Sequence, residues 1–192
     1  MAAAKPKDMT ADEFLIWNLS QDQRYELIDG VPVPLRAMSG ASNFHDHVVI
    51  NLIALLRDKL RGSGCMPRTA DTGLRTAIKR IRRPDVTVDC AQSRTGTYES
   101  HKPTAVFEVL SPSTRKIDGG VKFNEYQRPP TLRTIVHIDP ERMEVAVFQR
   151  DDAGLWTGEA YAAPDDRVII TGTPAVLTLA EIYDGIAIGE AV

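Results

Sequence analysis

Apolar positions along the chain recur with two periods, and together these predict a protein built from both helices and strands. The clearest helical pattern covers residues 42 or 43 to 61, where Val48, Leu52 and Leu56 fall on one face and Gly62 follows the last turn. Shorter helices are expected after Thr10, over residues 118–128 and over residues 178–183.

Alternating or short continuous apolar runs predict the strands. An Asp29-Gly30 pair between two such runs predicts a hairpin turn, and residues 91–103 are expected to form a polar loop. Another turn, over residues 71–73, is expected between two neighbouring strands. The strands expected cover residues 24–28, 31–35, 65–70, 74–78, 85–89, 104–110, 133–139, 143–150 and 155–161.

Two of these strands each carry a carboxylate in an apolar setting. On the strand over 104–110, Val106 and Glu108 share one face and Ala105 and Phe107 the other. An ionised Glu108 there is costly unless a cation, a metal or hydrogen-bond donors compensate its charge. Asp85 follows a proline, which suits the first residue of a strand. If the two strands are neighbours, both carboxylates lie at one end of a sheet, an arrangement that suits a divalent metal.

Composition indicates one ordinary globular domain. The chain has 192 residues, of which 43% are hydrophobic, enough for a sizeable core. Residues 1–9 are expected to form a disordered tail and residues 10–192 a single domain. No apolar run approaches the length of a membrane helix, and a signal-peptide core is missing. Cys65 and Cys90 are too few for a disulfide framework, so a reducing cytoplasm is the expected location.

The net charge of −3 argues against a constitutive, nonspecific nucleic-acid binder, but the charge is unevenly distributed. Residues 57–83 contain nine basic side chains and two acidic ones, and this segment leads directly into the Asp85 strand. It is either a solvated surface or a phosphate-attracting rim beside an acidic site. In the second interpretation, the phosphate-attracting residues are Lys79, Arg80, Arg82 and Arg83.

An ordered set of short motifs resembles a known family. Arg83-Pro84-Asp85-Val86, followed by Glu108-Val109-Leu110-Ser111-Pro112-Ser113, is similar to the PD-(D/E)XK nuclease pattern. The wider set resembles the Uma2 family of restriction-endonuclease-like proteins over about residues 10–185. The other residues of this wider set are Arg24-Tyr25-Glu26-Leu27-Ile28-Asp29-Gly30, His45, Asp118, Lys122, Tyr126 and Ile138-Asp139-Pro140.

The resemblance implies an α/β restriction-endonuclease-like fold, with a mixed central sheet flanked by helices and additional antiparallel strands over residues 143–161. It also implies an endonuclease that uses Mg²⁺ or Mn²⁺ to hydrolyse DNA. Asp85, Glu108 and the backbone carbonyl of Val109 are the implied metal ligands. Glu26 is implied to assist catalysis or to hold a second ion.

The sequence departs from the nuclease pattern at Leu110, where the motif has a lysine that positions or activates the attacking water. In proteins resembling Uma2 this lysine lies on the following helix, and Lys122 is its counterpart here. Asp118 and Tyr126 share the helical face of Lys122 and are second-tier candidates. His45 is another second-tier candidate, and the dipole of its helix is expected to keep the imidazole neutral.

Structural interpretations of the same residues stay open. Asp85 can pair with the arginines before it, and Glu108 can pair with a buried lysine. Glu26 can be an ordinary surface acid of a strand, and Lys122 can pair within its own helix in solvent.

Other functions also stay open for the whole protein. One is a noncatalytic binding or regulatory module that keeps the nuclease fold. Another is a carbohydrate-active hydrolase, which also uses two carboxylates, although an aromatic content of 6% offers little for a sugar-binding groove. Cleavage of both strands of a DNA duplex needs two sites, which would make the protein a homodimer.

Overall fold

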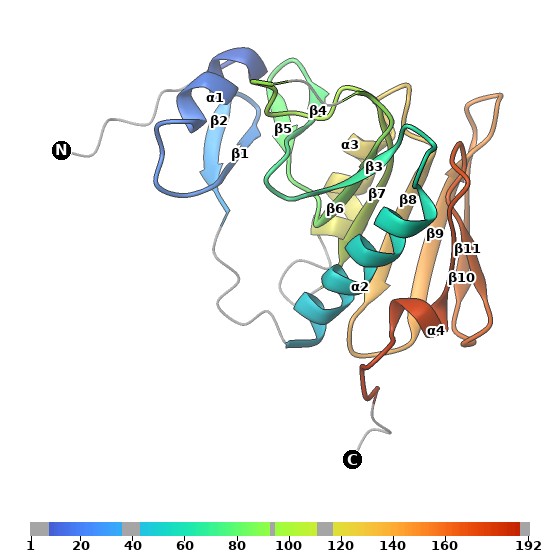
Figure 1. Ribbon diagram of the computed structural model, residues 1–192. Coiled ribbons are helices and arrows are strands. Elements are labelled where there is room, and N and C mark those ends of the chain that lie inside the picture. Colours follow the sequence, from blue (N-terminus) through green and yellow to red (C-terminus); the bar gives the residue numbers. More distant parts are fainter. Residues whose placement is uncertain (1–7, 36–42, 93–94, 111–116, 189–192) are drawn as a thin grey trace.

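A six-stranded mixed sheet forms the centre of the protein (Figure 1). The computed structural model describes residues 8–35, 43–92, 95–110 and 117–188. The strands of this sheet, in spatial order, are β10 (Trp156–Tyr161), β9 (Glu144–Arg150), β8 (Thr134–Asp139), β7 (Pro103–Val109), β6 (Val86–Asp89) and β3 (Met66–Thr69). Strands β7 and β8 are parallel, and the other neighbours are antiparallel. The expected mixed sheet with additional antiparallel strands is thereby confirmed.

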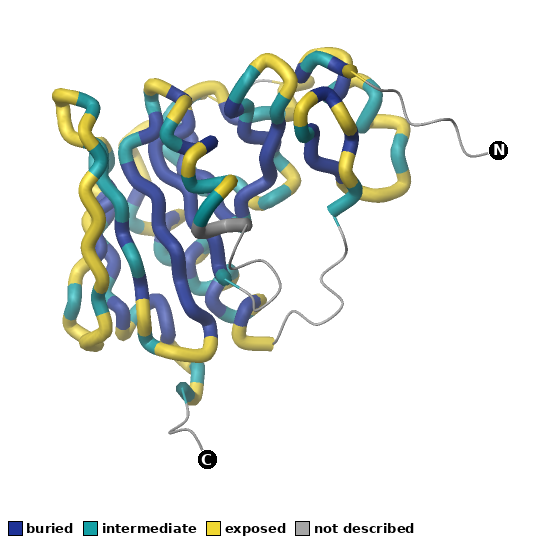
Figure 2. Tube along the Cα trace, turned by 180° about the vertical axis from the view of Figure 1, so that it is seen from behind, coloured by how far each residue is buried: buried dark blue, intermediate teal, exposed yellow. Residues whose placement is uncertain are grey.

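Helices cover both faces of the central sheet because β7 is apolar on both sides and buried along its whole length. Ala105, Phe107 and Val109 pack in the core that α2 (Asn43–Lys59) and α4 (Leu179–Ile182) complete. Val106 packs on the opposite face, in a cluster with α3 (Phe123–Tyr126). Figure 2 shows buried residues along the central strands and exposed residues at the β10 edge. Among the described residues, no helix is long and apolar enough to cross a membrane.

A smaller, four-stranded sheet lies beside the central one, at the upper left of Figure 1. In spatial order its strands are β2 (Val31–Pro34), β1 (Tyr25–Ile28), β5 (Arg80–Arg82) and β4 (Leu74–Ala77). Helix α1 (Ala11–Asn18) begins with a capping box formed by Thr10 and Glu13 and packs on this sheet through Phe14. The turn between β1 and β2 has positive φ at Asp29 (48°) and Gly30 (77°), as the expected hairpin requires.

The strands on either side of the turn at residues 71–73 belong to different sheets, and the expectation that they are neighbours was wrong. Strand β3 pairs with β6, whereas β4 pairs with β5, a strand that the sequence did not predict. The turn therefore takes the chain from the central sheet to the small sheet, and β5 brings it back to Asp85.

The helix expected over residues 118–128 consists of two different segments. A π-helix (Ile117–Lys122) leads directly into α3, which has only one turn and ends before Pro129. Near the C-terminus, β11 (Arg167–Ile169) and β12 (Val176–Thr178) form an unpredicted antiparallel pair. A capping box between Thr178 and Glu181 starts α4.

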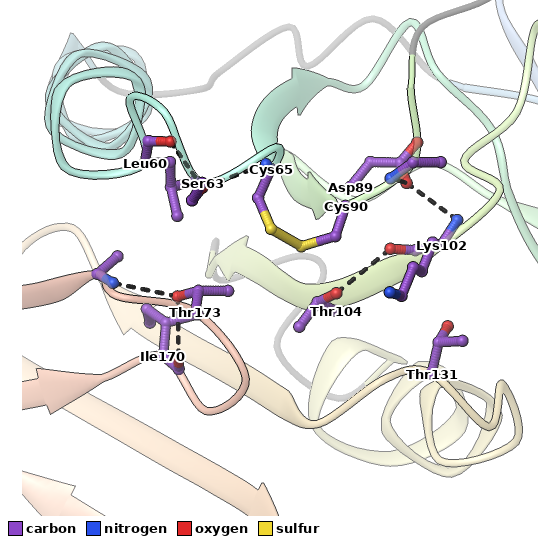
Figure 3. The surroundings of a disulfide bond; sticks show 12 residues. Leu60, Ser63, Cys65, Asp89, Cys90, Lys102, Thr104, Thr131, Ile170 and Thr173 are labelled. Atoms are coloured by element: carbon purple, nitrogen blue, oxygen red, sulfur yellow. Dashed lines mark hydrogen bonds between the residues drawn. A yellow bond between two sulfur atoms is a disulfide. The ribbon is translucent and has the colours of Figure 1, made fainter.

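Cys65 and Cys90 form a disulfide bond at the edge of the central sheet (Figure 3). Cys65 precedes β3 and Cys90 follows β6, and the adjoining residues Met66 and Asp89 face each other in the strand pair. The bond thus extends the pairing of these two strands. Because disulfides are typical of oxidising compartments, the cysteines do not support the expected cytoplasmic location.

Candidate active site

Asp85 directly precedes β6, and Glu108 lies on the neighbouring strand β7. Strand β6 is antiparallel to β7, and Val86 is opposite Phe107. The residue before Val86 and the residue after Phe107 therefore lie across from each other. In addition, the backbone N–H of Val109 donates a hydrogen bond to Oδ2 of Asp85 over 2.8 Å. The strand pairing brings both acidic residues of the nuclease motif to one end of the sheet.

Glu108 is compensated by two donors from the helical segment on its face of the sheet. Nζ of Lys122 lies 3.1 Å from Oε1 of Glu108, and the hydroxyl of Tyr126 donates to the same oxygen. The side chain of Glu108 is 4% exposed and that of Lys122 is 12% exposed. Burial raises the pKa of Tyr126 well above its ordinary value, and the charges of Glu108 and Glu26 raise it further. Tyr126 is therefore a hydrogen-bond donor at neutral pH.

His45, at the start of α2, lies against Asp85. Its Nε2 atom is 3.5 Å from Oδ2 of Asp85, and both side chains are largely buried. Burial lowers the pKa of His45, but hydrogen bonding and charge from Asp85, the charge of Asp46 and a hydrogen bond with the backbone of Val109 outweigh it. The net pKa of His45 is raised, so the contacts with Asp85 and its surroundings act against the effect that was expected of the helix dipole.

Glu26, on β1, is buried, so it is not an ordinary acidic residue on the exposed face of a strand. Its Oε2 atom accepts a hydrogen bond from Nη1 of Arg82 over 2.8 Å, and its Oε1 atom accepts one from the backbone N–H of Arg83 over 3.0 Å. Glu26 therefore anchors the two residues that precede Pro84 and Asp85.

Glu125 is a buried acidic residue of this region that no sequence motif singles out. It is 1% exposed and accepts hydrogen bonds from Arg82 and from Arg80. The arginines precede Glu125 by more than 40 residues, and pairing over such a distance leaves no local signal in a single sequence. Only the unusual density of arginines in β5 hints that some of them have internal partners.

The expected phosphate-attracting rim is not supported by the placement of its four residues. Arg82 is 2% exposed and Arg83 is 5% exposed, and the Arg83 guanidinium donates to backbone carbonyls, including that of Tyr25. Arg80 pairs with Asp29 and Glu125, and Lys79 pairs with Asp8. Three of these cations thus pair with acidic side chains, and Arg83 pairs with backbone carbonyls.

The donors at this site fit a hard divalent cation only in part. Among the described residues, no three His, Cys, Asp or Glu side chains lie close enough together to hold a metal ion. Asp85 and Glu108 supply two carboxylates, and the described contacts of Asp85 all go to Oδ2. A metal here would therefore also need the Val109 carbonyl and water.

Part of the expected motif lies outside the described residues. This applies to Ser111-Pro112-Ser113 and to the side chain of Asp118, and it also applies to residues 1–7 of the expected tail. Leu110 is described: its backbone N–H donates to the carbonyl of Ile138 over 2.8 Å, which continues the pairing of β7 and β8.

Comparison with known proteins assigns most of the chain to one family. The family model of Uma2, described as "Putative restriction endonuclease", matches residues 11–180. The chain belongs to the Uma2 family. An uncharacterized protein of Synechocystis sp. is 30% identical over 188 residues, which are 97% of this chain and 96% of the relative. Membership of Uma2 and the restriction-endonuclease-like α/β fold are both confirmed.

Proposed function

We propose that this Uma2 protein is a divalent-metal-dependent endonuclease that hydrolyses phosphodiester bonds in DNA. The observation that carries the proposal is the ion pair between Lys122 and Glu108, 3.1 Å long, at the end of β7 where Asp85 also lies. Two carboxylates and one lysine are the side chains that the nuclease motif needs. Here the lysine comes from the helical segment after β7 in place of Leu110.

Asp85, Glu108 and the carbonyl of Val109 would hold Mg²⁺ or Mn²⁺, since these ions prefer oxygen ligands. When bound, the metal supplies an activated water molecule and stabilises negative charge on the phosphate. The net charge of the two carboxylates and Lys122 is negative, which favours a cation. His45 contacts Asp85 and competes with the metal for its charge whenever the imidazole is protonated.

Lys122 has two roles in this proposal. In the free protein its ammonium group compensates the buried charge of Glu108. With substrate present, the same group is close enough to the metal ligands to orient the attacking water or to balance the phosphate charge. Tyr126 holds the carboxylate of Glu108 in one orientation through its hydrogen bond. We assign Glu26 an assisting role, because it anchors the chain just before Asp85.

We take DNA as the substrate because of the family description. We also propose that the protein acts as a homodimer. One active site cuts one strand, so cleavage of both strands in one encounter needs two copies of the chain. The products on a circular plasmid report on this directly, since single cuts give nicked circles and paired cuts give linear DNA.

A noncatalytic module with a nuclease fold is the second candidate, and Leu110 is the observation that favours it. The Lys122–Glu108 pair then serves only to stabilise a buried carboxylate. This alternative predicts metal binding at the site without hydrolysis of any nucleic acid.

Plasmid cleavage tests the proposal. Supercoiled DNA is incubated with the protein and Mg²⁺ or Mn²⁺, and the Asp85→Asn and Glu108→Gln variants are assayed in parallel. Asp152→Asn is the matched control, because the Asp152 side chain is 97% exposed and remote in sequence from the motif. The proposal predicts that the wild type and the control cleave the plasmid, and that the cleavage rate of the two site variants is lower by about 100-fold or more. Equal cleavage by Glu108→Gln would contradict it.

A further inference from the structure

Arg82 connects three elements of the fold through one guanidinium group. Its Nε and Nη2 atoms donate to the two oxygens of Glu125 over 2.6 and 2.9 Å, and Nη1 donates to Glu26 over 2.8 Å. The side chains of Arg82, Glu26 and Glu125 are 3%, 8% and 2% exposed. The network thus joins β5, β1 and α3 away from solvent, where charge-assisted hydrogen bonds are strong and directional.

Helix α3 faces both sheets at once. Glu125 and Tyr126 are adjacent, so their side chains point about 100° apart around the helix axis. Glu125 contacts β5 of the small sheet, whereas Tyr126 contacts Glu108 on β7 of the central sheet. Lys122 precedes Tyr126 by four positions and contacts the same carboxylate. The helix is therefore held from two directions, by Arg82 on one side and by Glu108 on the other.

The length of α3 makes these contacts decisive. It comprises four residues and follows a π-helix, and its N-cap position has no side-chain hydrogen bond. A single helical turn is not stable by its own backbone hydrogen bonds, so tertiary contacts must fix its position. Most of the polar tertiary contacts described for α3 involve Glu125, which accepts three hydrogen bonds, two from Arg82 and one from Arg80.

We propose that Arg82 and Glu125 are positioning residues that fix α3, so that Lys122 and Tyr126 stay in contact with Glu108. Neither residue touches the reacting groups, and Glu26 acts in the same network as the second anchor of Arg82. This inference rests on the proposed function for its catalytic consequence. Its structural part, the dependence of α3 on the Arg82–Glu125 pair, stands independently and is measured separately.

Hydrogen exchange tests the structural part. Glu125→Gln keeps the shape of the side chain and one acceptor, which protects the fold, and Arg82→Met removes the guanidinium. Asp152→Asn is the matched control, because it also changes a carboxylate that pairs with an arginine, Arg133, but at an exposed position. We expect backbone amides over residues 120–128 to exchange about tenfold faster or more in Glu125→Gln, with no change over β9. Unchanged exchange over residues 120–128 would overturn the proposal.

Cleavage kinetics test the catalytic part. In Glu125→Gln we expect kcat to fall about tenfold or more while the metal concentration for half-maximal activity stays within about twofold, because Lys122 is displaced but the metal ligands are not. The effects of Glu125→Gln and Lys122→Met on kcat should also be strongly non-additive, since the first already disables the second. Independent, multiplying effects would overturn the positioning role.

The two tests separate failure of this inference from failure of the proposed function. If the wild type does not cleave DNA, the proposed function fails, and the exchange rates alone decide whether the Arg82–Glu125 pair fixes α3. If the wild type cleaves and the exchange rates are unchanged in Glu125→Gln and Arg82→Met, the positioning inference fails and the proposed function stands.

Discussion

Lys122 and Glu108 form an ion pair in which Nζ lies 3.1 Å from Oε1, and the pair joins a π-helix to the penultimate residue of β7. Fourteen positions separate the two residues, whereas the nuclease motif places the lysine two positions after the glutamate. At that position this chain has Leu110, whose backbone extends the sheet. The helical segment after β7 thus delivers the positive charge that the strand lacks.

Replacement of Lys122 separates its two roles. We predict that Lys122→Met lowers the rate of DNA cleavage about 100-fold or more, because the charge that orients water or phosphate is lost. Binding of Mn²⁺ should be retained or tighter, since the mutation removes the cation that competes for Glu108. Cleavage assays and calorimetric titration measure the two effects. Lys59→Met, which breaks a pair with Glu181 elsewhere, is the control. Full activity of Lys122→Met would remove its assigned role.

Tyr126 contributes to stability through its hydroxyl. We predict that Tyr126→Phe lowers the free energy of unfolding by about 1–3 kcal/mol, because buried Glu108 loses one of its two described donors. Urea denaturation of wild type and variant gives this difference. Tyr98→Phe is the control, since Tyr98 is 46% exposed and its replacement should leave the free energy unchanged. Equal stability of Tyr126→Phe and wild type would show that the hydrogen bond adds nothing.

The disulfide bond should stabilise the fold by constraining the unfolded chain. Cys65 and Cys90 are 25 residues apart, and closing a loop of that length is worth about 3.5 kcal/mol. We predict that a reductant, or the double replacement Cys65→Ser with Cys90→Ser, lowers the free energy of unfolding by roughly this amount. The double variant should not respond further to reductant. Two free thiols in the untreated protein, detected by alkylation, would contradict the bond.

Glu181 links stability to acidic pH. Burial raises the pKa of Glu181, but its hydrogen bonds with Lys59 and Thr178 outweigh burial and lower the pKa below 4.5. A lowered folded pKa contributes stability above pH 4.5 that is lost as the pH falls through the folded value. Because 35% of the side chain is exposed, the contribution is at most about 1 kcal/mol.

Glu181→Gln isolates this contribution. The variant should be less stable than wild type at pH 7, and the difference should vanish below the folded pKa. Urea denaturation at both pH values measures it. A difference of the same size in acid would assign the effect to the helix cap instead of the charge.

Much of the site could be predicted from local sequence because its residues lie in regular patterns. Strict alternation places Glu108 on the same face of β7 as Val106, and the structure agrees. Asp85 could be placed at the start of a strand because it follows a proline. The four-residue spacing of Lys122 and Tyr126 puts both on one side of a helix, although this helix changes from π to α between them.

The rest depends on contacts between distant parts of the chain, which a single sequence does not reveal. Strand β5 has three residues and two arginines, and its buried Arg82 is neutralised by Glu26 on one side and Glu125 on the other. The same contacts remove Arg82 from the surface, so this arginine is not available to a phosphate. The expectation for His45 considered only its own helix, whereas Asp85, a residue 40 positions away, acts to raise the pKa of the imidazole.

Calorimetric titration of Mn²⁺ into the wild type and into Glu108→Gln tests the central claim most directly. The account predicts that the wild type binds the ion and that the variant, with one metal ligand neutralised, binds it at least about tenfold more weakly. Asp152→Asn should bind like the wild type. Equal binding by wild type and Glu108→Gln, or no binding by either, would contradict the claim that Asp85 and Glu108 form a metal site.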